Sequence, residues 1–243
     1  MVSMKARLIP IFLLFILGCL SSEEPLAINA ARQSLLADLC EQIMQEAYER
    51  AGHPFILTRE YGFDTLQAAN EGRVDGELYR IAGIEEAYTN LVPVPVSLIE
   101  MKAVIFTKGL TFPVAGPESL LPYRVGIMQG VVYMDRLTAG LVQEKVHRAP
   151  GEDQLLQLLD SGRVDAIISD QDTASLIIRQ KALSGISPLA PPLAVFPIHH
   201  YLHKRHSALI PGLTAALTDM EEEGRLEELR EEFRQGMAGF LSP

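Results

Sequence analysis

The chain has 243 residues and a formal net charge of −10, with 31 acidic residues against 21 Lys and Arg. An acidic chain without tryptophan is a poor nucleic-acid binder, because phosphate contacts need clustered cations and base stacking needs aromatic platforms. Its two cysteines exclude a disulfide scaffold and a cysteine-rich zinc module, and its 48% apolar content predicts a folded protein of one large or two small domains.

The first 22 residues have the order of a secretory signal. Lys5 and Arg7 precede an apolar run from Leu8 to Leu17, and small residues follow. The run is shorter than the roughly 20 residues that a membrane span needs. We therefore predict a signal peptide over 1–22 and a periplasmic or extracellular protein. A partial match to a lipoprotein processing site ends at Cys19, so a lipid anchor there and ordinary cleavage a few residues later both remain open.

Hydrophobic periodicity predicts strands and helices that alternate along the chain. In the first half we expect a helix over 34–51, strands over 26–29, 55–58 and 101–107, and an extended edge or crossing segment over 92–96. In the second half we expect a strand over 124–128, a helix over 134–144, a short strand at 201–202 and an acidic helix over 209–235. Proline- and glycine-rich segments predict linkers between two lobes at 108–122 and 187–197.

One four-residue motif occurs twice. Gly72-Arg73-Val74-Asp75 recurs as Gly162-Arg163-Val164-Asp165, each time after a helical pattern. Each glycine suits the residue after a helix, where the backbone turns left-handed. The second copy is followed by Ala166-Ile167-Ile168, a run typical of a buried strand. The repeat predicts a helix–turn–strand unit in each of two similar α/β lobes.

Several short motifs carry a family resemblance through their order and spacing. They are Asn70–Leu78, Arg80–Gly83, Asn90–Val92, Val125–Gly130, Gly162–Ala166 and Tyr201–Lys204. Together they resemble the extracellular solute-binding proteins of family 3, the polar-amino-acid type. The resemblance covers most of 26–235 and implies the two-lobed, type II periplasmic-binding-protein fold with two interlobe crossings. We expect residues 23–107 and 197–243 to form lobe 1 and residues 108–196 to form lobe 2.

The resemblance further implies that a small polar ligand, either amino-acid-like or an organic acid, binds in a cleft between the lobes. The family segment that matches Gln129, Gly130, Val131 and Val132 binds a carboxylate, and the acid that matches Asp170 pairs with an ammonium group. Val131 and Val132 replace the usual hydroxyl residues, so only backbone N–H groups remain as donors. Asp170 has an alternative role as the N-cap of the helix that follows it.

Arg80 and Glu77 are the candidate charged residues of the first lobe. Arginine offers a planar fork that suits a carboxylate, and Glu77 would either take a cationic group or hold Arg80 in place. A surface ion pair is the alternative. Aligned on Asp75, the usual carboxylate-binding arginine of the family falls on Ala87, which departs from standard α-amino-acid recognition. Truncation of Arg80 is expected to abolish a ligand response with little effect on stability.

Four of the six histidines are clustered, namely His199, His200, His203 and His206. Strand alternation would put His199 and His203 on one face and His200 on the other, which disfavours a zinc site. We therefore predict no metal or other cofactor, and we expect His200 to face the cleft. Tyr61 and Tyr133 are candidates for apolar or stacking walls, although core or exposed tyrosines are the commoner case.

The sequence lacks a nucleophile elbow, a phosphate loop, a zincin motif and a dinucleotide fingerprint. It therefore predicts a secreted solute-binding protein, with the permease of an ABC transporter as a membrane partner. Two alternatives stay open. One is a dehydratase-like enzyme on the same fold, with Glu77 or a histidine as general acid or base. The other is a ligand-sensing module for a membrane signalling partner.

Overall fold

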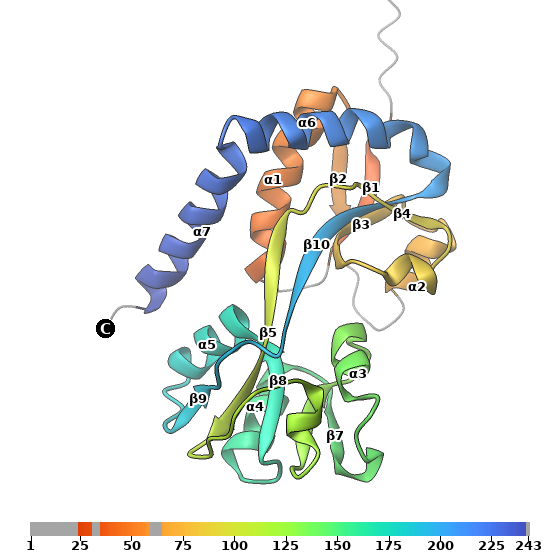
Figure 1. The fold of residues 1–243 in the computed structure, drawn as a ribbon. Helices are drawn as coiled ribbons and strands as arrows, with labels where there is room; N and C mark the ends of the chain where they lie inside the picture. The colour runs from red at the N-terminus through yellow and green to blue at the C-terminus, as the bar shows by residue number, and fades with distance from the viewer. Residues whose placement is uncertain (1–23, 31–34, 59–64, 242–243) are drawn as a thin grey trace, which may run out of the picture.

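Two long strands, β5 (Ile99–Lys108) and β10 (Ala194–His203), run side by side from one lobe of the molecule to the other (Figure 1). The structure is a computed structural model that describes residues 24–30, 35–58 and 65–241. Its described strands follow the hydrogen-bonded order β2 (Phe55–Thr58), β1 (Leu26–Asn29), β3 (Gly76–Ile81), β10, β5, β8 (Ala166–Asp170), β6 (Val125–Met128) and β7 (Val146–Ala149). The short strand β4 (Leu91–Pro93) pairs with β10, and β9 (Ile186–Pro188) pairs with β5. The two-lobed α/β fold with two crossing strands, expected from the sequence, is confirmed.

The first lobe is built on parallel strands covered by helices. Its strands are β1 (Leu26–Asn29), β2 (Phe55–Thr58), β3 (Gly76–Ile81) and β4 (Leu91–Pro93), and its helical segments are α1 (Leu35–Ala51), α2 (Thr65–Asn70), η1 (Ile84–Glu86), η4 (Lys204–Leu209) and α6 (Ile210–Glu222). Buried residues of α1 recur at helical spacing and include Cys40, Ile43, Met44 and Ala47. Burial raises the pKa of the Cys40 thiol, so this cysteine serves as a small apolar core residue.

The second lobe has its own sheet segment and its own apolar cluster. Its strands are β6 (Val125–Met128), β7 (Val146–Ala149), β8 (Ala166–Asp170) and β9 (Ile186–Pro188), and its helical segments are η2 (Pro117–Leu120), α3 (Val132–Thr138), η3 (Gln143–Lys145), α4 (Glu152–Asp160) and α5 (Gln171–Gln180). Phe106 of β5 packs there with Leu155, Leu159 and Ile167. The predicted helix over 134–144 is wrong in extent, because α3 ends before Gly140 and a separate turn follows.

The C-terminal acidic segment forms two helices instead of the one expected. Gly224 adopts a left-handed φ of 79° after α6, and α7 (Arg225–Leu241) leaves in a new direction. Figure 1 shows α7 descending from the first lobe toward α5, and the two helices are in contact. Arg230 donates hydrogen bonds of 2.9 Å to the carbonyl oxygens of Ser97 and Leu98, just before β5. Helix α7 therefore connects the two lobes beside the crossing strands.

The repeated motif has the same structural task in both lobes. Gly72 and Gly162 have φ values of 75° and 71°, as expected for residues that follow a helix. The Asp75 carboxylate accepts the backbone N–H of Ala27 at 2.7 Å, and the Asp165 carboxylate accepts that of Arg124 at 2.9 Å. Each aspartate thus fixes the start of its lobe's central strand, β1 or β6.

The lobe boundaries at 107/108 and 196/197 remain predictions. Residues Ala103–Thr107 of β5 pair with β8, whereas Ile99–Ala103 pair with β10. We therefore propose that the first crossing lies in the middle of β5. The predicted signal peptide over 1–22 and the candidate anchor Cys19 fall outside the described residues. Among the helices that the structure describes, none is long and apolar enough to cross a bilayer.

Candidate functional site

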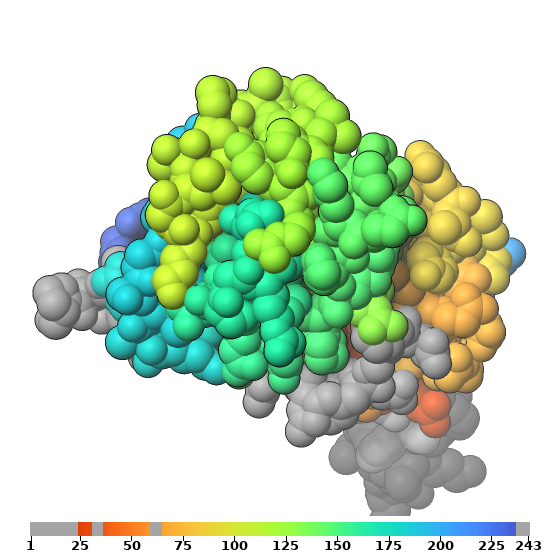
Figure 2. Space-filling view, turned by 90° about the horizontal axis from the view of Figure 1, so that it is seen from below, coloured from red at the N-terminus to blue at the C-terminus, as the bar shows by residue number. Residues whose placement is uncertain are grey.

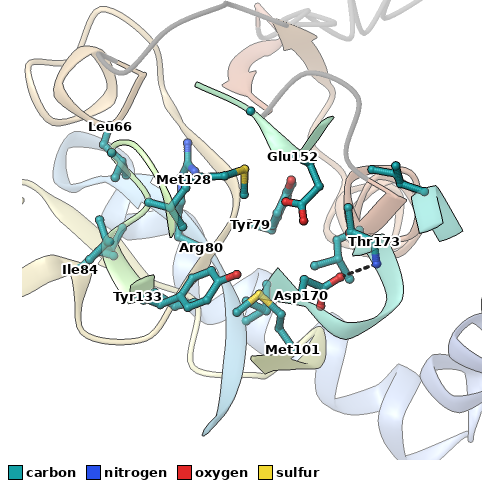
Figure 3. Close-up of a pocket in the computed structure, with 18 of the residues that line it drawn as sticks. Leu66, Tyr79, Arg80, Ile84, Met101, Met128, Tyr133, Glu152, Asp170 and Thr173 are labelled. Carbon is teal, nitrogen blue, oxygen red and sulfur yellow. Dashed lines mark hydrogen bonds between the residues drawn. The ribbon is translucent and has the colours of Figure 1, made fainter. Parts of the chain in front are cut away.

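A cavity of about 630 Å³ lies between the two lobes. Figure 3 shows the residues around it, which come from the ends of strands and the first turns of helices in both lobes. Most of its lining is apolar and is contributed by Leu36, Leu66, Ile84, Met101, Met128, Val132, Ile177 and Ile198. A few charged groups face this apolar lining, a composition typical of sites for small organic ligands.

Arg80 lines the cavity from the first lobe and is fixed by Glu77. Its Nε and Nη2 atoms lie 2.9 and 2.6 Å from Oε2 of Glu77, and Nη2 also donates to Thr65 Oγ1 at 3.0 Å. The Glu77 side chain is only 1% exposed, does not line the cavity, and accepts a hydrogen bond from Asn29. Of the two roles weighed for Glu77, its contacts match the one in which it holds Arg80 in place.

Asp170 lines the cavity from the second lobe, at the end of β8. Its side chain accepts the backbone N–H of Thr173 at 2.9 Å and so caps α5. The residue is 9% exposed, and burial raises the pKa of its carboxyl. The two roles expected for Asp170 are therefore compatible, because one oxygen can cap the helix while the carboxyl borders the cavity.

Glu152 is a cavity residue that the sequence did not single out. It is the first residue of α4, and Ser169 Oγ donates a hydrogen bond of 2.5 Å to its Oε1. Its Oε2 is buried and finds no hydrogen-bond partner among the described residues. Burial, with the negative charges of Asp170 and Asp153, raises the pKa of Glu152 to about 7. In the sequence, the turn at Pro150-Gly151 could have indicated Glu152 as a cavity residue, because it places Glu152 at the sheet edge where Asp170 also lies.

The turn between β6 and α3 supplies the next part of the lining. Gly130, Val131 and Val132 border the cavity, whereas Gln129 is exposed and does not. Tyr133 also lines the cavity, and its ring centroid lies 5.5 Å from that of Phe196. Burial and the nearby carboxyls of Asp170 and Glu152 raise the pKa of Tyr133, which keeps its hydroxyl protonated. Tyr133 therefore forms a wall, as considered from the sequence, whereas Tyr61 lies outside the described residues.

The expectation that His200 faces the cleft is corrected by the structure. His200 is 0% exposed in the core of the first lobe, with Nδ1 3.2 Å from the carbonyl oxygen of Leu78 and Nε2 2.9 Å from the Tyr48 hydroxyl. A carbonyl only accepts, so Nδ1 carries the proton and Tyr48 donates to Nε2. The pairing of β10 with β3 shifts register between His199 and Tyr201, so simple alternation does not predict which side chains turn inward.

Two of the remaining clustered histidines, His199 and His206, make separate contacts. His199 Nδ1 lies 3.1 Å from the carbonyl oxygens of Val94 and Val96, and His206 Nε2 lies 2.6 Å from Asp75. Within the part of the chain that the structure describes, no group of three or more histidine, cysteine or acidic side chains is arranged to hold a metal ion.

Arg136 of α3 bridges the lobes at one edge of the cavity. Its guanidinium donates to the carbonyl oxygen of Gly83 at 2.7 Å and to that of Ala82 at 3.4 Å. In Figure 2 the green atoms around α3 lie next to the yellow and orange atoms of the first lobe. This contact holds the lobes together without depending on a buried charge.

Replacing Arg136 with alanine is expected to favour a more open arrangement of the lobes. Each lost hydrogen bond is worth about 1 kcal/mol, enough to shift a balanced two-state equilibrium several-fold. Small-angle scattering should show a larger radius of gyration, while circular dichroism and the unfolding midpoint change little. An unchanged radius would mean that Arg136 does not set the separation of the lobes.

Comparisons with solved structures place this geometry in a known architecture. A histidine kinase sensor domain with similarity to periplasmic binding proteins superposes with a TM-score of 0.75 at 17% identity, covering 87% of this chain and 96% of that one. The chain has the fold of periplasmic binding proteins. The GluR0 ligand-binding core, in complex with L-glutamate, matches this fold with a TM-score of 0.74 at 13% identity, over 87% of this chain and 99% of that one.

The same fold occurs in ArtJ, an arginine-, lysine- and histidine-binding protein from Geobacillus stearothermophilus. It matches with a TM-score of 0.69 at 15% identity, over 86% of this chain and 95% of that one. Other similar structures are substrate-binding proteins of amino acid ABC transporters. In sequence, the chain is 23% identical to an uncharacterized protein of Shewanella oneidensis over 197 aligned residues, an alignment that covers 79% of this chain and 74% of that one. No family model matches the chain.

Proposed function

We propose that this protein works outside the cytoplasm and captures a small polar molecule between its lobes. The observation that carries the proposal is a cavity of about 630 Å³ to which each lobe contributes apolar walls and at least one charged side chain. Because neither lobe forms the whole site, a ligand that contacts both favours the closed arrangement. The extracytoplasmic location is supported by the signal-like order of residues 1–22.

Two partners are compatible with ligand capture on this fold. Transport through an ABC permease is supported by the similarity to substrate-binding proteins of such transporters, and a sensing role by the similarity to a kinase sensor domain. The two roles differ in the event that closure of the lobes triggers. Loss of uptake of the ligand in a deletion strain would support transport, whereas ligand-dependent phosphorylation by a membrane kinase would support sensing.

A thermal-shift screen with amino acids, amines and organic acids tests ligand capture. A compound at 100 times its Kd should stabilise the protein by about 2.7 kcal/mol, which raises the Tm by several degrees. Mass spectrometry of the same samples should show the compound unchanged. A screen without any stabilising compound would refute the proposal, and formation of a product would favour the enzyme alternative, with Glu152 in place of Glu77 as its acid or base.

A further inference from the structure

The charges around the cavity are unequally distributed between the lobes. The positive charge of Arg80 is met by Glu77 within the first lobe. The carboxyls of Glu152 and Asp170, on the second lobe, form no ion pair with any described residue. The cavity therefore has a surplus of acidic groups on one side.

Figure 3 shows the Glu152 carboxyl and the Tyr133 hydroxyl directed toward the space between them, with the Asp170 carboxyl beside that space and joined to Thr173 by a hydrogen bond. The Ser169 hydroxyl donates a hydrogen bond to one carboxyl oxygen of Glu152, and the backbone N–H of Thr173 donates one to a carboxyl oxygen of Asp170. The buried Oε2 of Glu152 has no donor within the described residues. A buried carboxyl oxygen without a donor is costly, so a ligand that supplies a donor there gains binding energy.

The opposite requirement, a site for a carboxylate, is poorly met by the described residues of this cavity. Nε and Nη2 of Arg80 already contact Glu77, and the turn before α3 presents Val131 and Val132 instead of hydroxyl side chains. Val131, which caps α3, offers no side-chain hydrogen bond. Ala87, where the resemblance would place an arginine, is exposed and does not line the cavity.

We propose that the cavity selects an organic amine with an apolar body, whose ammonium or guanidinium group lies between Glu152 and Asp170. This inference rests on the proposed function and names the ligand class for the same site. The ligand's body would contact Tyr79, Tyr133, Met101 and Met128, and thioethers pack favourably against aromatic rings. An aromatic or branched amine suits this lining and a cavity of about 630 Å³.

Amine capture is coupled to loss of a proton from Glu152. The cation takes the place of the proton on the carboxyl, so one proton leaves Glu152 for solvent as the ligand enters below pH 7. Since the pKa of free Glu152 is raised to about 7, affinity for an amine should fall about tenfold for each pH unit below that value. A carboxylic acid ligand would show the opposite slope.

The other charged groups near Glu152 do not supply this dependence. Asp153, its neighbour on α4, pairs with Lys181 next to α5 at 2.8 Å, and Arg80 faces it across the cavity in an ion pair of its own. Of the charged groups on the other elements packed against α4, Arg148 pairs with Asp135 and Lys108 with Asp160. His147 lies near Asp165, and Lys102 lies near Asp172. Asp170 and Tyr133 have raised pKa values, and deprotonation of Asp170 would steepen the same trend.

Three compounds that share a phenylethyl group test the ligand class. They are 2-phenylethylamine, L-phenylalanine and 3-phenylpropanoate, which carry an ammonium group, both groups and a carboxylate, respectively. Calorimetric titration of the full chain at pH 8 should give the tightest binding for the amine. Repeating the amine titration at pH 6 should weaken binding about tenfold, and at that pH heats in buffers of different ionisation enthalpy should report proton release.

Glu152→Gln is the variant that isolates the carboxyl. It keeps the size of the side chain, and we expect at least a tenfold loss of affinity for 2-phenylethylamine at pH 8 and a pH profile flatter than that of the wild type. Asp160→Asn removes an acid from the other end of α4, where Asp160 pairs with exposed Lys108. This control variant should leave both the affinity for 2-phenylethylamine and its pH profile unchanged. Circular dichroism confirms that both variants are folded.

The outcomes separate this inference from the function on which it rests. Tighter binding of L-phenylalanine or 3-phenylpropanoate than of the amine would overturn the amine class but leave ligand capture intact. A Glu152→Gln variant that binds the amine with unchanged affinity would also overturn it. If none of the three compounds binds and the wider screen finds only acidic ligands, the amine class is refuted but ligand capture is not. If the wider screen finds no ligand, both proposals are refuted.

Discussion

Arg80→Ala is expected to lower the free energy of unfolding of the ligand-free protein by about 3 kcal/mol. The substitution removes the cation from the Glu77 carboxylate, which is 1% exposed and, among the described residues, keeps only the amide of Asn29 as a partner. Removing one member of a buried ion pair costs about 3–5 kcal/mol, because the remaining charge is uncompensated. We take the lower end because Arg80 itself is 22% exposed. Urea denaturation at pH 7 measures the loss.

Matched variants show whether the cost arises from Glu77. Glu77→Gln alone should cost about 1 kcal/mol, since the half-buried Arg80 can still reach water. The double variant Glu77→Gln with Arg80→Ala should be more stable than Arg80→Ala, because no charge is left buried. If Arg80→Ala is as stable as the wild type, or if the double variant is the least stable of the three, the ion pair does not contribute as described.

This expected loss of stability is larger than the small effect that the sequence alone led us to expect. The sequence places Glu77 and Arg80 three residues apart in a short strand, which is equally compatible with an exposed pair. Burial of Glu77 depends on Asn29 and on the packing of β1 beside β3, and these are contacts between segments far apart in the chain. Local pattern alone does not reveal them.

The elements predicted best are those with strong local signals. The strands over 26–29 and 55–58 match β1 and β2 at both ends, and a proline directly precedes each of these short apolar runs. The glycines of the repeated motif follow their helices as expected. By contrast, residues 187–197 were predicted as a linker, but residues 194–197 begin β10, because pairing with β5 outweighs the local proline signal.

Sequence reasoning found part of the cavity. Arg80, Gly130, Asp170 and Tyr133 lie around it because strand ends and helix N-termini meet between the lobes of such a fold. It did not find Glu152. That residue is distinguished by a buried oxygen without a donor and by its contact with Ser169, and neither property is visible in a helical pattern.

His200 and Glu152 are expected to give the protein two opposite dependences of stability on pH. Burial lowers the pKa of His200 from 6.5 to about 4. Between these pH values the unfolded chain binds a proton at His200 and the folded chain does not, so the free energy of unfolding falls as the pH drops below 6.5. Burial raises the pKa of Glu152 from 4.5 to about 7, so the folded chain binds the extra proton and stability rises over the same range. Each of these two groups changes the free energy of unfolding by about 3 kcal/mol across this pH range.

Because the two effects nearly cancel in the wild type, single variants are needed to see them. Glu152→Gln should be about 3 kcal/mol more stable than the wild type at pH 8 and should lose that advantage toward pH 4.5. His200→Gln, whose amide can replace the contacts with Tyr48 and Leu78, should show the reverse: its stability relative to the wild type improves as the pH falls from 6.5 to 4.

Urea denaturation of the three proteins at pH 4.5, 5.5, 6.5 and 8 measures these differences. The exposed ion pairs, such as that of Arg124 with Asp165, contribute equally to all three proteins and drop out of each comparison. Parallel stability curves for Glu152→Gln and the wild type would contradict a Glu152 carboxyl that titrates near pH 7. That outcome would also remove the proton coupling expected for amine binding, whereas parallel curves for His200→Gln alone would concern only the core of the first lobe.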